Sequence, residues 1–258
     1  MERIKIVFIT ESEPFYMADA FRYFFSHDVG AIDIKSAFIL NYFHVGYTGA
    51  NRINYLDVLR AFGPINFFKA LVRILKGRFS ADKQVSNIFI NQGIPVFNGL
   101  EDINAEDVVK KIQTYQPDYI VAVGVNSLFN KKLLHASRFG CINLHSGIKP
   151  EHRGRASIFW ALADGCAETG VTVHKIEEGV DTGNVIATRH YTISERSLDK
   201  VLLDIRMLGM DALLESLNKI VHHQEIAGGQ RIDSSCKPRP YPNLDDLKMF
   251  VKNGNRLF

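Results

Sequence analysis

Three polar residues near the middle of the sequence have side chains that can move protons and stabilise developing charge. Asn143 and His145 stand two apart in a short apolar run, and Asp181 follows a second apolar run and precedes Thr182-Gly183. A histidine with a near-neutral pKa can act as a general base or as a donor, and an asparagine amide can donate to an oxyanion. A carboxylate can orient an imidazole or accept a proton through water. Together they predict a site for proton-coupled attack on a substrate.

The same residues also have structural interpretations. A single histidine is often only a hydrogen-bonded structural residue, and Asn or Asp beside Gly is often part of a turn. Ser146 follows His145 but lacks the G-x-S-x-G setting of a nucleophilic serine. We therefore expect direct attack by an external substrate without a covalent intermediate.

Strands alternating with helices must position these residues. The predicted strands are residues 4–10, 31–40, 94–97, 118–124, 141–145, 170–177 and 184–193. The predicted helices are residues 15–25, 55–78, 105–115, 131–136, 198–221 and 244–251, with Asn104 as the expected N-cap of the third. Residues 143 and 145 share one face at the end of a strand, where open parallel sheets bind ligands.

This alternation predicts an α/β fold with a doubly wound, mostly parallel sheet, followed by a C-terminal helix and a short tail. We divide the chain into a catalytic domain over residues 1–225 and a tail with one short helix over residues 226–258. The first strand is followed by Thr-Glu-Ser-Glu-Pro and by no G-x-G-x-x-G pattern, which argues against a dinucleotide site.

Composition and charge limit the classes of protein to which the chain can belong. The chain has 258 residues, a net charge of +3 and three widely spaced cysteines, which predict neither a disulfide framework nor a metal site. No apolar run approaches the length of roughly 18 residues that a membrane span needs. We expect a cytoplasmic protein with no nucleic-acid partner and no membrane span.

The predicted helix over residues 55–78 is dense in both apolar and basic side chains. Gly63-Pro64 should break it into two pieces. A packed helix with a solvated basic face is favoured over a membrane-surface helix, and contact with a substrate or a partner stays open. The surface over residues 62–75 and the proline-containing tail are candidate contacts for a homodimer.

The central motifs resemble the formyltransferase family that uses 10-formyltetrahydrofolate. The resemblance rests on residues 143–150 (NLHSGIKP), 153–154 (RG), 169–174 (TGVTVH) and 181–183 (DTG). The resemblance is specific over about residues 118–195, and before residue 118 it extends only to the architecture. The family pattern is N-x-H-x-S-L-L-P, so Gly-Ile-Lys replaces the usual S-L-L run, while the Asn, His, Pro and Asp positions are kept.

The resemblance implies a Rossmann-like formyltransferase fold and an enzyme of one-carbon metabolism that transfers a formyl group to an amine. Asn143 and protonated His145 would hold the oxyanion, and His145 or a water bound to Asp181 would move the amine's proton. The segment 124–129 is similar to the family's pterin-binding loop, which assigns cofactor contacts to Ser127, Leu128 and Phe129, with Val180 closing the other side. The implied co-substrate is 10-formyltetrahydrofolate, and no metal is implied.

Only analogy with the family narrows the identity of the acceptor amine. About 35 residues follow the long helix, fewer than the tRNA-holding barrel of methionyl-tRNA formyltransferases needs, and the phosphate loop of the glycinamide ribonucleotide enzymes is missing. The favoured acceptor is therefore a small-molecule amine on a nucleotide-linked amino sugar. A methionyl-tRNA enzyme, another small-molecule amine formyltransferase or a 10-formyltetrahydrofolate hydrolase are the alternatives. The acceptor pocket is expected at Thr10, Glu11, Ser12 and Arg153.

Overall fold

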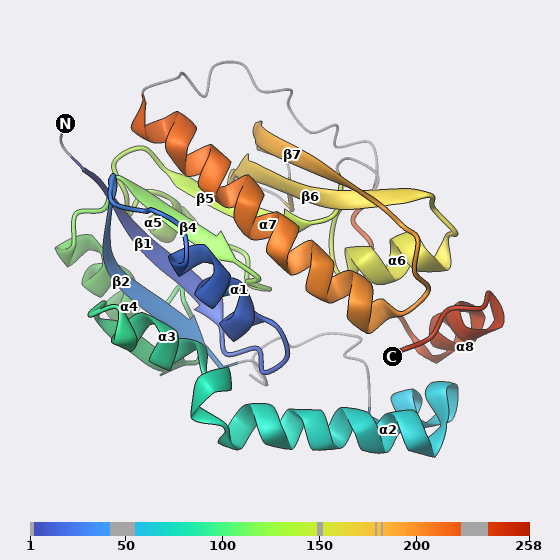
Figure 1. The fold of residues 1–258 in the computed structure, drawn as a ribbon. Helices are drawn as coiled ribbons and strands as arrows, with labels where there is room; N and C mark the ends of the chain where they lie inside the picture. The colour runs from blue at the N-terminus through green and yellow to red at the C-terminus, as the bar shows by residue number, and fades with distance from the viewer. Residues whose placement is uncertain (1–2, 42–54, 149–151, 179, 182, 223–236) are drawn as a thin grey trace.

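A seven-stranded sheet forms the centre of the molecule in the computed structural model, which describes residues 3–41, 55–148, 152–178, 180–181, 183–222 and 237–258 (Figure 1). The strand order is β3-β2-β1-β4-β5-β6-β7. Neighbouring strands are parallel from β3 to β5, whereas β6 pairs antiparallel with β5 and with β7. The predicted doubly wound, mostly parallel α/β fold is confirmed. The strands are β1 (Ile4–Glu11), β2 (Ile32–Leu40), β3 (Val96–Leu100), β4 (Tyr119–Val123), β5 (Cys141–Ser146), β6 (Glu168–Lys175) and β7 (Val185–Thr192).

Helices cover both faces of this sheet. The helical elements are α1 (Met17–Phe25), α2 (Tyr55–Phe79), η1 (Ala81–Lys83), α3 (Val85–Asn91), α4 (Glu106–Thr114), α5 (Lys131–Leu134), α6 (Ser157–Ala163), α7 (Leu198–Val221) and α8 (Leu244–Lys252). Helices α1, α3 and α7 pack on one face and α4 and α5 on the other. The long helix α7 crosses the front face of the sheet in Figure 1.

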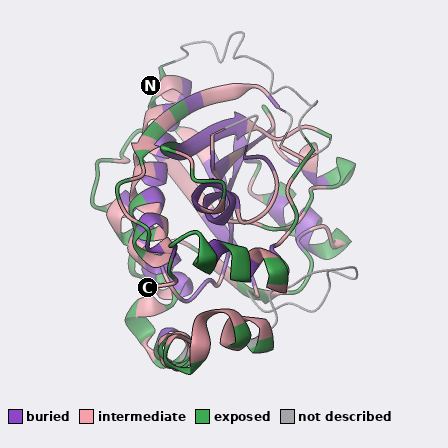
Figure 2. Ribbon diagram, turned by 90° about the vertical axis from the view of Figure 1, so that its right-hand side faces the viewer, coloured by how far each residue is buried: buried purple, intermediate pink, exposed green. Residues whose placement is uncertain are grey.

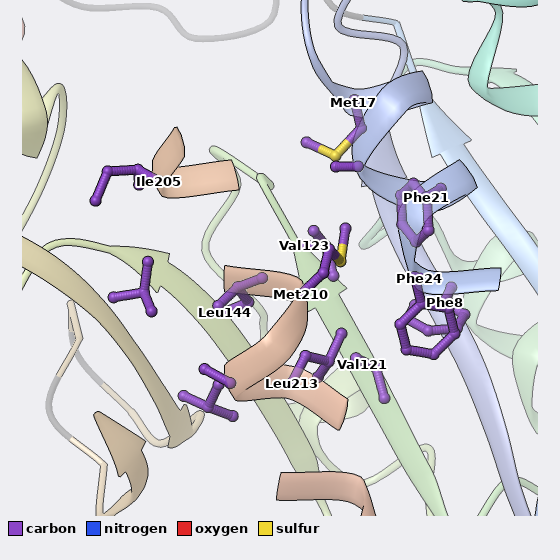
Figure 3. Close-up of a cluster of buried hydrophobic side chains, with 14 of the residues drawn as sticks. Phe8, Met17, Phe21, Phe24, Val121, Val123, Leu144, Ile205, Met210 and Leu213 are labelled. Atoms are coloured by element: carbon purple, nitrogen blue, oxygen red, sulfur yellow. The ribbon is translucent and has the colours of Figure 1, made fainter. Parts of the chain in front are cut away.

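Alternate residues of the central strands enter two separate apolar layers. In β1, Ile6 and Phe8 pack with α1 and α7, while Val7 and Ile9 pack with α4. Figure 3 shows the first layer, where Leu144 of β5 meets Met210 of α7. Because parallel strands are buried on both faces, they read as continuous apolar runs in the sequence, which is why their positions could be predicted.

Helix α2 lies below the rest of the molecule in Figure 1 and contains the predicted break. Gly63 has a non-helical backbone with φ of 78°, so two helical pieces meet there ahead of Pro64. Among the α2 residues whose burial the structure describes, Gly77 is buried and the others are intermediate or exposed, as the colours of Figure 2 show for this part of the molecule. Ile65 and Phe68 are 72% and 64% exposed. The helix is thus packed only on part of its surface.

The described part of the tail packs on the body of the molecule. Arg239 pairs with Gly154 in a short parallel bridge, and Phe250 of α8 stacks on Phe159 of α6 with ring centroids 4.6 Å apart. The predicted boundary at residue 225 lies outside the described residues.

Two details differ from the sequence prediction. Helices α3 and α6 were not predicted, because each is only seven residues long and gives a weak periodic signal. The N-cap prediction for α4 is wrong: Ala105 holds that position without a side-chain bond, because the Asn104 amide is engaged by residues Leu128 and Asn130. None of the described helices is both long and apolar enough to cross a bilayer.

Candidate active site

A cavity of about 690 Å³ opens at the carboxyl ends of β4 and β5. One wall is the segment that follows β4, a second wall is formed by residues 176–178 and 180–181, and α7 contributes a third. Asn143, His145 and Asp181 all line this cavity, so the structure brings the three predicted catalytic residues together. Such a crevice at the ends of parallel strands is the usual ligand position in open α/β sheets.

His145 is held by both ends of its imidazole ring. Nε2 lies 2.8 Å from the carbonyl oxygen of His152 and 3.1 Å from the Ser157 hydroxyl. Because a carbonyl oxygen can only accept, Nε2 is the protonated nitrogen and donates to it. Nδ1 faces Oδ2 of Asp181 at 3.6 Å. The ring is therefore oriented so that Nδ1 is the nitrogen directed toward the carboxylate.

Asp181 stands at the point where the second wall meets the strand ends. Its Oδ2 accepts from the backbone N–H of Gly154 at 3.0 Å, and its Oδ1 lies 3.6 Å from Nε2 of His174. The backbone of Asp181 has φ of 52°, a left-handed conformation that costs a non-glycine residue energy. This conformation places one carboxylate between two imidazole rings.

His174 is a member of the cluster that the sequence interpretation missed. It is 2% exposed, and its Nδ1 lies 2.7 Å from the carbonyl oxygen of Lys175, which makes Nδ1 the donor. Its Nε2 then accepts from Nδ2 of Asn143 at 3.2 Å. The signal was present, since the motif TGVTVH contains this histidine, but recognising it needs the antiparallel pairing that sets His174 opposite Asn143.

The predicted cofactor residues lie on two walls of the cavity. Ser127, Leu128 and Phe129 come from the segment after β4, and Val180 comes from the other wall. Both carboxylate oxygens of Glu11 hold Asn126 in this segment, with bonds of 2.6 Å from its backbone N–H and 2.9 Å from its side-chain amide. Apolar side chains from two separate segments suit a flat heteroaromatic ring, so the cavity lining is compatible with the pterin that the resemblance implies.

The four predicted acceptor-binding residues are not among the residues that line the cavity. Thr10 is fully buried and donates to the carbonyl of Val123, and Arg153 is 3% exposed and donates to the carbonyl of Val180 at 2.6 Å. Glu11 holds the segment after β4, as described above. Contact of Thr10, Glu11, Ser12 and Arg153 with an acceptor stays a prediction, whereas the structure gives Glu11 and Arg153 a positioning role.

Two buried carboxylates and one arginine set the charge on the α7 side of the site. Burial raises the pKa of Glu11 and of Glu13, and hydrogen bonds and the nearby charge of Arg206 oppose this shift. Glu13 accepts backbone N–H groups from Phe15, Tyr16 and Met17 at the start of α1. Arg206 of α7 lines the cavity and was missed by the sequence interpretation, because one charged residue among several in a long helix gives no motif.

Similarity to solved structures first defines the class of fold. A glycinamide ribonucleotide transformylase 1 from Symbiobacterium toebii has a TM-score of 0.62 and 14% identity, covering 90% of this chain and 93% of its own. A sugar N-formyltransferase from a Shewanella species has a TM-score of 0.56 and 14% identity, covering 97% and 87%. At such identities the likeness shows a shared formyltransferase fold alone.

The sequence then gives the family. The family model described as "Formyl transferase" matches residues 80–216, and the chain belongs to the formyl transferase family. A methionyl-tRNA formyltransferase from Clostridium novyi is 28% identical over 67% of this chain and 55% of its own, and one from Geobacter metallireducens is 33% identical over 56% and 47%. The chain thus spans about half the length of the curated relatives it matches.

Proposed function

We propose that this chain transfers a formyl group from 10-formyltetrahydrofolate to a primary amine by direct attack. The observation that carries this proposal is the contact cluster of Asn143, His145 and Asp181 inside one cavity at the strand ends. His174 joins them through its contacts with Asn143 and Asp181. An amide, an imidazole and a carboxylate arranged in this way can bind an oxyanion and exchange a proton beside it.

The reaction begins when the amine nitrogen forms a bond to the formyl carbon and the carbonyl electrons move to oxygen. The second hydrogen of the Asn143 amide donates to this oxyanion, because the first is directed to His174. Protonated His145 donates from Nδ1, since its Nε2 is used by the His152 carbonyl. When the carbonyl re-forms, the bond to N10 of the folate breaks, N10 gains a proton and the amine loses one. A water bound to Asp181 carries the amine's proton, or His145 takes it after giving its own Nδ1 proton to N10.

In this proposal the pterin of the folate binds between the two walls. Ser127, Leu128 and Phe129 line the cavity on one wall and Val180 on the other, and they would contact the pterin so that N10 comes near Asn143 and His145. The segment after β4 is preformed for this contact, because Glu11 and Asn104 fix it from both ends. A preformed site lowers the entropic cost of binding.

A nucleotide-linked amino sugar is the acceptor that we favour. Support comes from the sugar N-formyltransferase whose fold matches 97% of this chain. Methionyl-tRNA is the second candidate acceptor, because the curated relatives cited above carry the name of that activity. The third candidate is water, which would make the chain a 10-formyltetrahydrofolate hydrolase.

The experiment that tests this proposal follows folate absorbance after mixing the full chain with 10-formyltetrahydrofolate. Parallel reactions contain aminated nucleotide sugars, methionyl-tRNA, simple primary amines or no amine. We expect turnover that requires an amine and is fastest with one class of nucleotide sugar. Equal turnover without any amine would replace transfer by hydrolysis, and fastest turnover with methionyl-tRNA would replace the sugar acceptor.

A further inference from the structure

Arg206 places a guanidinium group beside the proposed reaction centre. The side chain comes from α7 and lines the cavity. Its Nη1 lies 3.3 Å from the hydroxyl of Ser146, the residue after His145. Its Nη1 and Nη2 lie 3.6 and 3.9 Å from the point that a Cβ on Gly124 would occupy, so the group sits over the end of β4. This position is on the α7 side, at the start of the segment that follows β4.

The hydrogen-bonding capacity of Arg206 is largely unused. A guanidinium has five N–H donors. Within the described residues, Nε of Arg206 is buried and has no hydrogen-bond partner, and the hydroxyl of Ser146 is the acceptor that Nη1 reaches. A partly buried cation whose donors lack acceptors is costly to maintain, and such groups commonly serve a ligand.

The neighbouring carboxylates do not use these donors. Glu11 and Glu13 act on Arg206 through their charge, but the oxygens of Glu11 accept from Asn126 and those of Glu13 accept from the start of α1. In the described part of the chain, the Arg206 guanidinium has the Ser146 hydroxyl as its hydrogen-bond partner and forms no salt bridge with an Asp or Glu. Both carboxylates are therefore engaged elsewhere, and the fork of Arg206 is left open.

We propose that Arg206, with the hydroxyl of Ser146, binds an anionic group of the acceptor. The inference rests on the proposed function, which places the amine beside His145, one residue from Ser146. The planar fork of an arginine matches the two oxygens of a carboxylate or of a phosphate, so the acceptor is an amine that also carries one of these groups. Arg206 therefore determines which amines are accepted and is not needed for proton transfer.

Binding of simple oxyanions tests this site without knowledge of the acceptor. Isothermal titration of the full chain uses pyrophosphate in one arm and acetate in the other. We expect the chain to bind one of the two, pyrophosphate for a phosphate-bearing acceptor or acetate for a carboxylate-bearing one. Arg206→Gln should weaken that binding by about 10- to 100-fold, the range of a lost charged hydrogen bond. The oxyanion affinity of Arg206→Lys, which keeps the charge but loses the fork, should lie between those of the parent chain and of Arg206→Gln.

Arg138→Gln is the matched control, because this exposed arginine lies over Phe139, outside the cavity. It should bind the oxyanion as the parent chain does. Circular dichroism checks that each variant is folded, and Ser146→Ala provides a second variant that should weaken binding without removing a charge. Binding of neither oxyanion by the parent chain, or equal binding by Arg206→Gln, would overturn the proposal.

Kinetics separate this inference from the proposed function. With any amine that is formylated, Arg206→Gln should raise KM for the amine by 10-fold or more and leave KM for 10-formyltetrahydrofolate unchanged. A rise only in the folate KM would assign Arg206 to the folate's own carboxylates and overturn the inference, while formyl transfer would stand. Oxyanion binding that depends on Arg206 in a chain that formylates no amine would support the anion site and refute the formyl transfer.

Discussion

At the scale of single residues, the site depends on side chains that fix one another's hydrogens. His145 is fixed by the carbonyl of His152, and Asn143 is fixed by His174. The first bond selects the His145 tautomer with hydrogen on Nε2 and leaves Nδ1 toward the cavity, and the second fixes the amide orientation of Asn143. The sequence could supply Asn143, His145 and Asp181, because their motif spacing is distinctive. It could not supply His174 and Arg206, because their roles depend on strand pairing and on helix placement that spacing alone does not reveal.

His174 provides a prediction at this scale. His174→Leu removes the acceptor for the Asn143 amide, so the amide can rotate and its donor leaves the oxyanion position. We expect kcat to fall by about 5-fold, in line with about 1 kcal/mol for a lost hydrogen bond, with little change in KM for the folate. Steady-state kinetics measure both values. The exposed His190 on the neighbouring strand provides the matched control, and His190→Leu should leave kcat unchanged. A kcat for His174→Leu equal to that of the parent chain would refute this role.

At the scale of elements, the ends of the strands and the short segments after them form the site, and the buried parts of the strands form the core. The strand β4 is wholly buried, and the segment that follows it forms a cavity wall held by Glu11 and Asn104. The sequence predicted the strands because buried runs are apolar throughout. It misplaced Asn104 as a helix cap, because a side chain with a local capping geometry can instead take a distant partner.

Helix α1 begins at a buried carboxylate, which gives a prediction about pH. Burial raises the pKa of Glu13 above its ordinary value of 4.5, against the effect of Arg206 and of three backbone N–H groups. A raised folded-state pKa means that the contribution of Glu13 to stability is present at low pH and is lost as the pH rises through the folded pKa. Compared with Glu13→Gln, the parent chain should therefore lose relative stability as the pH rises above 4.5.

Urea unfolding of the parent chain and of Glu13→Gln from pH 4 to pH 8 measures this difference. The exposed Glu106 in the first turn of α4 serves as control, and Glu106→Gln should show no comparable trend. A difference between the parent chain and Glu13→Gln that stays constant, or that moves in favour of the parent chain, would contradict the predicted direction.

At the scale of the whole molecule, a parallel half and an antiparallel half of one sheet meet at the site. The parallel strands supply the crevice, and the antiparallel β6 brings His174 against β5. The tail packs near this site, because Arg239 pairs with Gly154 and the backbone N–H of Gly154 donates to Asp181. The sequence predicted the alternating architecture, but contacts between the tail and residues some 80 positions earlier leave no local signal.

Packing of the tail helix can be tested directly. Phe250 is fully buried and stacks on Phe159, whereas Met249 beside it is 52% exposed. Phe250→Ala should lower the free energy of unfolding by about 3–5 kcal/mol, the usual cost of removing a buried phenyl ring. Met249→Ala is the matched control and should change it by about 0.5 kcal/mol or less. Urea unfolding that gives similar losses for the two variants would show that α8 does not pack as described.

The central claim, that Asn143 and His145 act on a formyl group held on folate, is tested most directly by separating binding from turnover. Asn143→Ala and His145→Ala are each titrated with 10-formyltetrahydrofolate by calorimetry and then assayed for formyl transfer with the best amine found. The account predicts folate affinity close to that of the parent chain and a kcat lower by about 10²- to 10³-fold in each variant, because each lacks one group that stabilises the oxyanion. Transfer at the rate of the parent chain in either variant would contradict it.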